Sequence, residues 1–422
     1  MQLFVDESGP FNIFDKLLTS VRNFHWAPTS PLRNTDPTDP NLCNQETTVV
    51  NINRIVLMSI LAISLGLPTR SNAQAGAGAV FVMTNAADKN EIIAYERNTD
   101  GSLGRSRRFS TGGRGSGGTI DPLASQGSLT ITEDHTFLLA VNAGSGEISV
   151  FRVHQALLEL VDVTPCDGSE PVAVAQHGNL VYVVNAGGTS NVVGFYLDRN
   201  GKLKQIRNSL AFLTTANSAP GSLSFSPDGH TLLITEKATN RIDAYQVHAD
   251  GTLGPIVVNP AVGPGTFAVF FAPNGAALVA ETGPAGGNSA SAISSYALLP
   301  NLSLSAVSAS VPTLGAATCW LAVTPNGKVV YTSNAGTSTI SGFTISPDGS
   351  LAPLAGTVLA TLPTGSTNLD LAVTSDGRFL YSLDSGTGVV SIFAIGEDGL
   401  LTALGERGSF RASAGVNGII AN

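Results

Sequence analysis

A sequence motif of about fifty residues is repeated along this chain, and it restricts the possible folds more than any other feature. Its clearest copies begin at Leu223, Leu321 and Leu371, and weaker copies begin at Leu129, Val172 and Phe271. Each copy contains an apolar strand, an Asp-Gly or Asn-Gly type of turn, a second strand that ends in Asn, Asp or Glu, and a third strand with an aromatic residue. A second turn then leads to a fourth strand. The repeat predicts units of four short antiparallel strands.

The spacing of the turn glycines sets the number of units. The first-turn glycines follow one another at intervals of 51, 46, 52 and 50 residues, at Gly178, Gly229, Gly275, Gly327 and Gly377. Glycine suits these turns because a two-residue hairpin turn needs positive φ angles. A four-stranded unit of this size is typical of a propeller blade, and residues 76–422 have room for seven. We therefore predict an all-β, seven-bladed β-propeller.

The two ends of the repeat region complement each other. Residues 79–103 make a unit that lacks its first strand, whereas residues 415–421 make a first strand that lacks its unit. We expect the C-terminal strand to pair with the N-terminal blade. Such pairing closes the ring and removes the open strand edges that invite aggregation.

Composition excludes several classes of protein. Charged residues make up only 13% of the chain, there are 46 glycines, and the net charge is −9. An acidic chain without a basic run is a poor nucleic-acid binder, because such proteins need clustered Lys and Arg. After residue 75, Cys166 and Cys319 are too few for a disulfide framework, and we expect two free, half-buried thiols and no metal site. We expect a monomer.

The N-terminal residues have the pattern of an export signal. Within residues 51–75, Arg54 precedes an apolar run over residues 55–67, and a small-residue cleavage site ends at Ala75. The run of 13 residues is too short to span a bilayer as a helix, so we expect no stable membrane insertion. Residues 1–50 are a polar extension unlike the rest, which suggests that translation starts further downstream. The pattern predicts a secreted or periplasmic protein.

The repeated motif, and above all residues 110–153, resembles the seven-bladed lactonase family that includes bacterial 6-phosphogluconolactonase and fungal carboxymuconate-lactonizing enzyme. The resemblance covers residues 76–422 and implies hydrolysis of a lactone. It also implies a histidine acting with arginine and glutamate near the top of the channel, next to a His-Pro-His-like crossing between blades. The comparable crossings here, which begin at Cys166, Asn217 and Thr364, contain no histidine. The catalytic residues of the family therefore do not carry over.

Candidate site residues lie at the ends of the second strands, where each unit supplies one polar side chain. They are Asn85, Asn142, Asn185, Glu236, Glu281, Asn334 and Asp384. This end of the strands belongs to the face that also carries the crossings between blades, here called the top face. We predict Glu236 and Glu281 as general bases toward water and the other five as substrate-binding groups. Two alternatives are that these side chains only cap turns, and that the carboxylates bind Ca²⁺.

Two arginines complete the predicted site. The glycine-rich crossing at residues 111–127 contains Arg114, whose guanidinium and neighbouring backbone N–H groups suit an oxyanion or a carboxylate. Arg411 lies in the last crossing and is a second predicted cationic contact for substrate. The crossing is not a phosphate-binding P-loop, because no Gly-Lys-Ser/Thr follows. Simple flexibility is the alternative reading of its glycines.

Two functions from different classes fit these residues. The first is an exported hydrolase of a sugar lactone or a similar small cyclic ester, with no required cofactor. The second is a non-catalytic propeller that binds a ligand or a protein on its top face. The missing family histidines favour the second function, since all five histidines after residue 75 lie in or beside turns of the opposite, bottom face: His135, His154, His177, His230 and His248.

Overall fold

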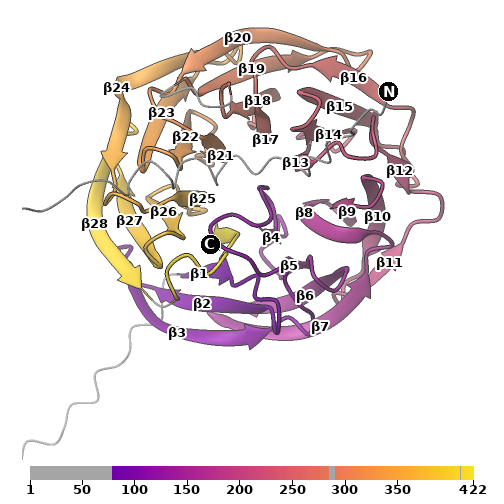
Figure 1. Ribbon diagram of the computed structural model, residues 1–422, viewed down its shortest axis with the longest axis horizontal. Coiled ribbons are helices and arrows are strands. Elements are labelled where there is room, and N and C mark those ends of the chain that lie inside the picture. The colour runs from indigo at the N-terminus through magenta and orange to yellow at the C-terminus, as the bar shows by residue number, and fades with distance from the viewer. Residues whose placement is uncertain (1–77, 285–289, 409) are drawn as a thin grey trace, which may run out of the picture. The chain divides into compact units, whose positions relative to one another are not determined.

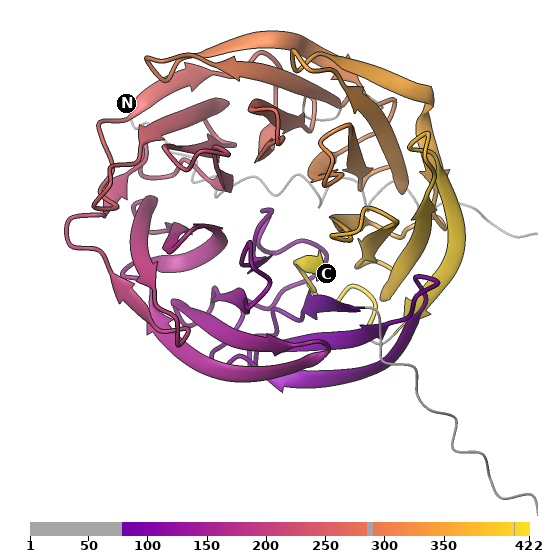
Figure 2. The same ribbon diagram turned by 180° about the vertical axis from the view of Figure 1, so that it is seen from behind.

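A computed structural model describes residues 78–284, 290–408 and 410–422. These residues form 29 β-strands, arranged as seven antiparallel sheets that follow one another around a ring (Figure 1). The same ring seen from behind shows the short strands near the centre and the long strands on the rim (Figure 2). The predicted fold, an all-β propeller with seven blades, is confirmed.

Each blade begins with an inner strand and ends with an outer one. Blade 1 contains β29 (Ile419–Ala421), β1 (Gly78–Met83), β2 (Glu91–Arg97) and β3 (Leu103–Ser110). Blade 2 contains β4 (Leu129–Ile131), β5 (Phe137–Asn142), β6 (Glu147–His154) and β7 (Leu157–Pro165). Blade 3 contains β8 (Ser169–His177), β9 (Leu180–Gly187) and β10 (Asn191–Leu197), with both β11 (Leu203–Gln205) and β12 (Ala211–Phe212) on its outer edge.

The remaining blades repeat the four-strand order. Blade 4 contains β13 (Pro220–Phe225), β14 (Thr231–Glu236), β15 (Arg241–Gln246) and β16 (Val257–Pro260). Blade 5 contains β17 (Thr266–Phe271), β18 (Ala276–Glu281), β19 (Ala292–Leu298) and β20 (Leu304–Pro312). Blade 6 contains β21 (Thr318–Val323), β22 (Val329–Asn334), β23 (Thr339–Ile345) and β24 (Leu351–Thr361). Blade 7 contains β25 (Asn368–Val373), β26 (Phe379–Asp384), β27 (Val389–Ile395) and β28 (Leu401–Gly408).

Burial explains which strands of the repeat are apolar. The second strands, such as β14 and β26, are buried along their whole length because both of their faces pack against neighbouring blades. The outer strand β28 is exposed at nearly every position, and it contains the charged residues Glu406 and Arg407. A strand with both faces buried reads as a continuous apolar run rather than as an alternation, and this is the pattern of the repeat.

The ring closes where the sequence predicts it. β29 pairs antiparallel with β1, with Val80 opposite Ala421 and Val82 opposite Ile419. Val416 and Ile419 are almost completely buried and belong to one apolar cluster with residues of blades 7 and 1. The last strand therefore supplies both the edge partner of β1 and part of the core between the first and last blades.

Buried tyrosines tie successive blades together. Tyr381, in blade 7, donates its hydroxyl to the carbonyl of Gly101 in blade 1 at 2.7 Å. Tyr331, in blade 6, makes the same bond to Gly399 in blade 7 at 2.8 Å. Burial raises the pKa of both phenols above their ordinary range, so the hydroxyls stay protonated as donors.

Gly101 provides a test of this interface between blades 7 and 1. Its φ is 84°, and an added Cβ would lie 2.4 Å from the ring of Phe379. We expect Gly101→Ala to destabilise the protein by about 2–5 kcal/mol, because it combines backbone strain with overpacking. Gly275 has a φ of 87° and no atom within 4 Å of an added Cβ, so Gly275→Ala should cost only about 1–2 kcal/mol. Equal denaturation midpoints for the two variants would contradict the tight interface.

The structure does not bear on the export signal, because residues 51–75 lie outside the described residues. Within the part of the chain that is described, no helix is long and apolar enough to cross a membrane. Cys166 and Cys319 are free, as expected, but both are fully buried rather than half-buried. Cys166 lies in the crossing that precedes β8, and Cys319 lies in the inner strand β21.

Candidate functional site

The ring of predicted polar residues lies inside the blades. All seven side chains are at most 1% exposed. Asn142 shows the pattern: it accepts a hydrogen bond from the hydroxyl of Thr111 in the preceding crossing at 2.7 Å, and it donates to Ser149 in the third strand at 2.7 Å. The second strand is one strand away from the channel, so its last residue joins the third strand to the crossing. This placement supports the turn-capping alternative.

The carboxylates of the ring follow the same pattern. Glu281 accepts hydrogen bonds from Ser294 at 2.5 Å and from Ser310 at 2.7 Å, and Asp384 accepts from Ser391 at 2.5 Å and from Ser382 at 2.7 Å. Burial raises the pKa of Glu281, and it raises that of Asp384 to about 7. The groups face hydroxyls of their own blade.

In blade 1, Thr84 rather than the predicted Asn85 takes the position that the ring residues occupy in the other blades. The register places Thr84 opposite Glu91, the first residue of β2, and the hydroxyl of Thr84 accepts a hydrogen bond from the N–H of Glu91 at 2.9 Å. Asn85 follows with a φ of 49° and bonds instead to Ser116 and to the carbonyl of Gly415. Asn85 thus joins the first and last crossings on the top face.

Asn185 and Asn334 also bond within their blades. Asn185 donates to Asn191 at 2.9 Å, and Asn334 donates to Ser341 at 2.8 Å. The two predicted arginines, Arg114 and Arg411, have exposed side chains. The structure therefore does not bring the arginines together with the ring carboxylates, and their roles in catalysis and binding stay predictions.

A different group of residues meets at the centre of the ring. Residues 120–128 form the end of the crossing that precedes β4, and they contact the inner strands of several blades. We call them the channel segment. The carbonyl of Ser125 accepts a hydrogen bond from the indole of Trp320 at 2.9 Å, and the Ser125 hydroxyl donates to the carbonyl of Val172 at 2.8 Å. The side chain of Gln126 bonds to both the N–H and the carbonyl of Leu321. The segment reaches the middle of the ring (Figures 1 and 2).

Lys237 is the cation of this central group. It directly follows Glu236 at the end of β14, and its ammonium donates to the carbonyls of Ala124 and Pro220, each at 2.7 Å. The ammonium also lies 5.3 Å from the ring centre of Phe267. Its third N–H has no acceptor among the residues that the structure describes, and the side chain is only half-buried. Burial lowers the pKa of Lys237 to about 8.

Asp121 is connected to this cation through Ala124, whose carbonyl accepts from the ammonium of Lys237. One of its oxygens, Oδ1, accepts hydrogen bonds from the N–H of Ala124 at 3.0 Å and from the amide of Asn417 at 2.8 Å. Burial raises the pKa of Asp121 to about 7, and the nearby charge of Lys237 opposes that rise. Within the described parts of the chain, no donor bonds to Oδ2. This oxygen therefore has capacity for a water molecule or a ligand.

Asp370 holds the central group in place. Its carboxyl accepts from Gln126 at 2.9 Å, from its neighbour Leu371 at 2.9 Å and from Ile419 of the closing strand at 3.3 Å. Burial raises its pKa to about 7, and the charge of Asp121 adds to the rise. Asp370 is 3% exposed, so it acts as a fixed acceptor that connects the channel segment with the ring closure.

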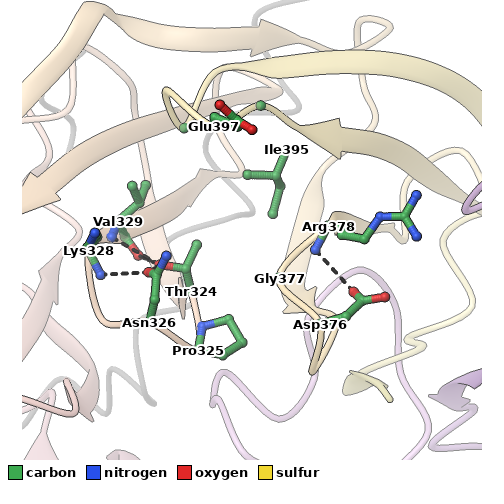
Figure 3. A pocket seen from close by; sticks show the side chains of 12 residues that line it. Thr324, Pro325, Asn326, Lys328, Val329, Asp376, Gly377, Arg378, Ile395 and Glu397 are labelled. Atoms are coloured by element: carbon green, nitrogen blue, oxygen red, sulfur yellow. Dashed lines mark hydrogen bonds between the residues drawn. The ribbon is translucent and has the colours of Figure 1, made fainter.

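The bottom face carries a cleft of about 340 Å³ between the turns of blades 6 and 7. The polar groups in its walls serve the turns themselves: Asp376 accepts from the N–H of Arg378, and Asn326 accepts from the N–H of Lys328. Figure 3 shows the guanidinium of Arg378 directed away from Lys328 and Glu397. No set of charged groups converges on the cleft, and we place the candidate site at the centre of the top face instead.

The sequence contained signals for the central residues. Lys237 follows the ring residue of its blade, where blades 2, 3 and 6 have Ala143, Ala186 and Ala335. Asp370 interrupts an apolar inner strand at the position where blade 6 has Trp320. The contact of Asp121 with Asn417 had no such signal, because the two lie 296 residues apart and meet only in the closed ring.

These features define a class of protein, a closed seven-bladed propeller with ionisable side chains gathered around a segment at the centre of the ring. The chain belongs to the seven-bladed β-propeller lactonase family, whose model matches residues 80–212 and 269–415. Among solved structures, a candidate 6-phosphogluconolactonase from Bacteroides uniformis is similar, with 20% identity, a TM-score of 0.61 and coverage of 82% of this chain and 99% of that one. The periplasmic gluconolactonase of Pseudomonas aeruginosa is similar at 15% identity, a TM-score of 0.60 and coverage of 82% and 98%. A comparison with curated protein sequences gives no match.

Proposed function

We propose that this protein is an exported, monomeric hydrolase of a sugar lactone or a similar small cyclic ester, with its site at Asp121 and Lys237. One observation carries the proposal. In a lactonase-family propeller, Ala124 connects a lysine ammonium with an uncommitted N–H to a carboxyl group with an uncommitted oxygen, because its carbonyl accepts from Lys237 and its N–H donates to Asp121. This pair supplies the two groups that ester hydrolysis needs, a base for water and a donor for the oxyanion.

The reaction follows from the roles of the two groups. Ionised Asp121 removes a proton from water as the water oxygen attacks the lactone carbonyl carbon. The ammonium of Lys237 donates to the carbonyl oxygen, which becomes negative in the tetrahedral intermediate. The intermediate then breaks the bond between the carbonyl carbon and the ring oxygen, which takes the proton from Asp121. The product hydroxy acid releases a proton to solvent, and no metal or other cofactor is required.

Export is proposed from the leader pattern of residues 51–75. The similarity to a periplasmic gluconolactonase supports the same location. An exported enzyme meets neutral sugar lactones rather than sugar phosphates, and the negative charge of the chain also disfavours a phosphorylated substrate.

Proton release from a panel of lactones tests the function. We expect purified protein comprising residues 76–422 to hydrolyse at least one small neutral lactone at pH 7.5, with the same rate in Ca²⁺ and in a chelator. If the protein hydrolyses none of these lactones, the proposed hydrolase function is wrong and the ligand-binding alternative is favoured. Calorimetric titration with the same lactones would then distinguish a binding propeller from an inert one.

A further inference from the structure

Blade 4 contains a second buried acid beside its ring residue. Asp243 lies in β15 opposite Ile234, and the side chain of Glu236, two residues along β14, lies on the same face of the sheet. Both residues are 0% exposed. In blade 5 the residues at the same two positions, Ser294 and Glu281, form a hydrogen bond, so these two positions lie within hydrogen-bonding reach of each other. Two carboxyl groups this close in a buried site cannot both be ionised without a large electrostatic cost.

The other blades show what normally occupies this position. The residues equivalent to Asp243 by register are serines in four blades, namely Ser149, Ser294, Ser341 and Ser391. In blades 5 and 7, whose ring residue is also an acid, the serine hydroxyl donates to the carboxylate, as Ser294 does to Glu281 and Ser391 to Asp384, both at 2.5 Å. Blade 4 therefore has a carboxyl group where its sister blades have a hydroxyl donor.

The hydrogen bonds of blade 4 distinguish the two acids. Glu236 accepts from the N–H of Thr214 at 2.8 Å and from the hydroxyls of Thr214 and Thr239. Asp243 has two buried oxygens that receive no donor from the described residues. Glu236 thus has three donors, whereas the absence of donors and the burial favour the neutral form of Asp243.

We propose that Asp243 is held in its protonated form and donates a hydrogen bond to Glu236, so that this bond positions Lys237 and breaks when the proton is lost. The bond replaces the serine donor of the sister blades. Burial, followed by the charge of Glu236, raises the pKa of Asp243 to about 8. Of the other titratable groups that face it, Arg241 opposes this rise, and Tyr245 is neutral because its own pKa is raised.

The link from this pair to the candidate site is short. Glu236 holds Thr214 at the start of the crossing into blade 4, and the backbone N–H of Lys237 bonds to Ala219 near its end at 3.1 Å. The next residue, Pro220, accepts from the Lys237 ammonium. Loss of the shared proton would place two repelling charges at the base of this crossing. Asp243 is thus a positioning residue, and its role in catalysis rests on the proposed function, whereas its protonation does not.

The protonation is measured directly by infrared difference spectroscopy between the wild type and Asp243→Asn at pH 7. We expect the wild type to show the carbonyl stretch of a protonated carboxyl group that the variant lacks, and to lose it as the pH rises through about 8. Absence of that band at pH 7 would overturn the proposal. A band that Ca²⁺ abolishes would also overturn it, in favour of a cation site.

Stability gives a second readout that is independent of activity. The pKa of Asp243 is raised from 3.8, so the folded protein holds a proton that the unfolded chain loses, and stability falls between about pH 4 and pH 8. We expect Asp243→Ser, which restores the residue of the sister blades, to raise the melting temperature by about 3–6 °C at pH 9 relative to its effect at pH 5. The reverse graft, Ser294→Asp beside Glu281, should create a new loss of stability over the same range. An equal effect of Asp243→Ser at both pH values would contradict the shared proton.

The positioning role is tested by competitive acetylation of Lys237 against pH. In Asp243→Ala the crossing loses its donor, so the pKa of Lys237 should move up from about 8 toward its ordinary value, and Asp243→Ser should restore it. An unchanged titration of Lys237 in Asp243→Ala would overturn the positioning role, even if the lactonase assay fails.

Discussion

Replacing Lys237 by methionine should lower kcat/KM for lactone hydrolysis by about 10²–10³-fold, the usual effect of removing one oxyanion donor. Methionine keeps the length and apolar contacts of the side chain, including its approach to Phe267, but it has no N–H group. Because the ammonium bonds most strongly to the oxyanion of the intermediate, kcat should fall as much as kcat/KM. Initial rates over a range of lactone concentrations measure both constants.

A matched control separates this effect from a general loss of positive charge. Lys328 is an exposed lysine on a bottom-face turn, so Lys328→Met should keep wild-type kinetics. Asp121→Asn should lose about 10²–10⁴-fold, as expected for a general base. If Lys237→Met remains fully active while its melting temperature is unchanged, the oxyanion role is wrong.

Deleting residues 410–422 should abolish the cooperative folding of the whole ring. The deletion removes β29 and the buried side chains of Val416 and Ile419, a loss of about 3–6 kcal/mol from apolar burial alone. This is comparable with the total stability of many domains, and the bare edge of β1 promotes aggregation. Thermal unfolding followed by circular dichroism measures the loss.

The truncated protein can be tested for specific repair. A synthetic peptide of residues 410–422 should restore the unfolding transition when added in excess, whereas a peptide in which Ile419 is replaced by aspartate should not. A truncated protein that melts like the full chain would contradict closure by β29.

The fold could be predicted because its causes are local and repeated. Each blade carries its own turn signals and apolar strands, and the half-units at residues 79–103 and 415–421 predicted the pairing of β1 with β29. Periodicity of this kind survives even where the sequence identity to similar structures is 20%. The strands could therefore be located in the sequence without knowing which distant segments are in contact.

The candidate site was harder to predict because it depends on which strand faces the channel. The ends of the second strands carry the polar residue of every repeat, and this regularity drew attention to Glu236 and Glu281. The same regularity is what a capping role produces, and both side chains are buried in their blades. Asp121 and Lys237 are exceptions to the repeat rather than parts of it. Their meeting depends on a crossing that turns into the channel, which no local pattern determines.

The pH dependence of kcat/KM tests the central claim most directly. Asp121 must be ionised to accept a proton, and its pKa is raised to about 7. Lys237 must be protonated to donate, and its pKa is lowered to about 8. A bell-shaped profile with its maximum between these values is therefore expected, with the acidic limb lost in Asp121→Asn and the alkaline limb lost in Lys237→Met. A profile that stays flat from pH 6 to pH 9, or one whose limbs survive both substitutions, would contradict a site built on this pair.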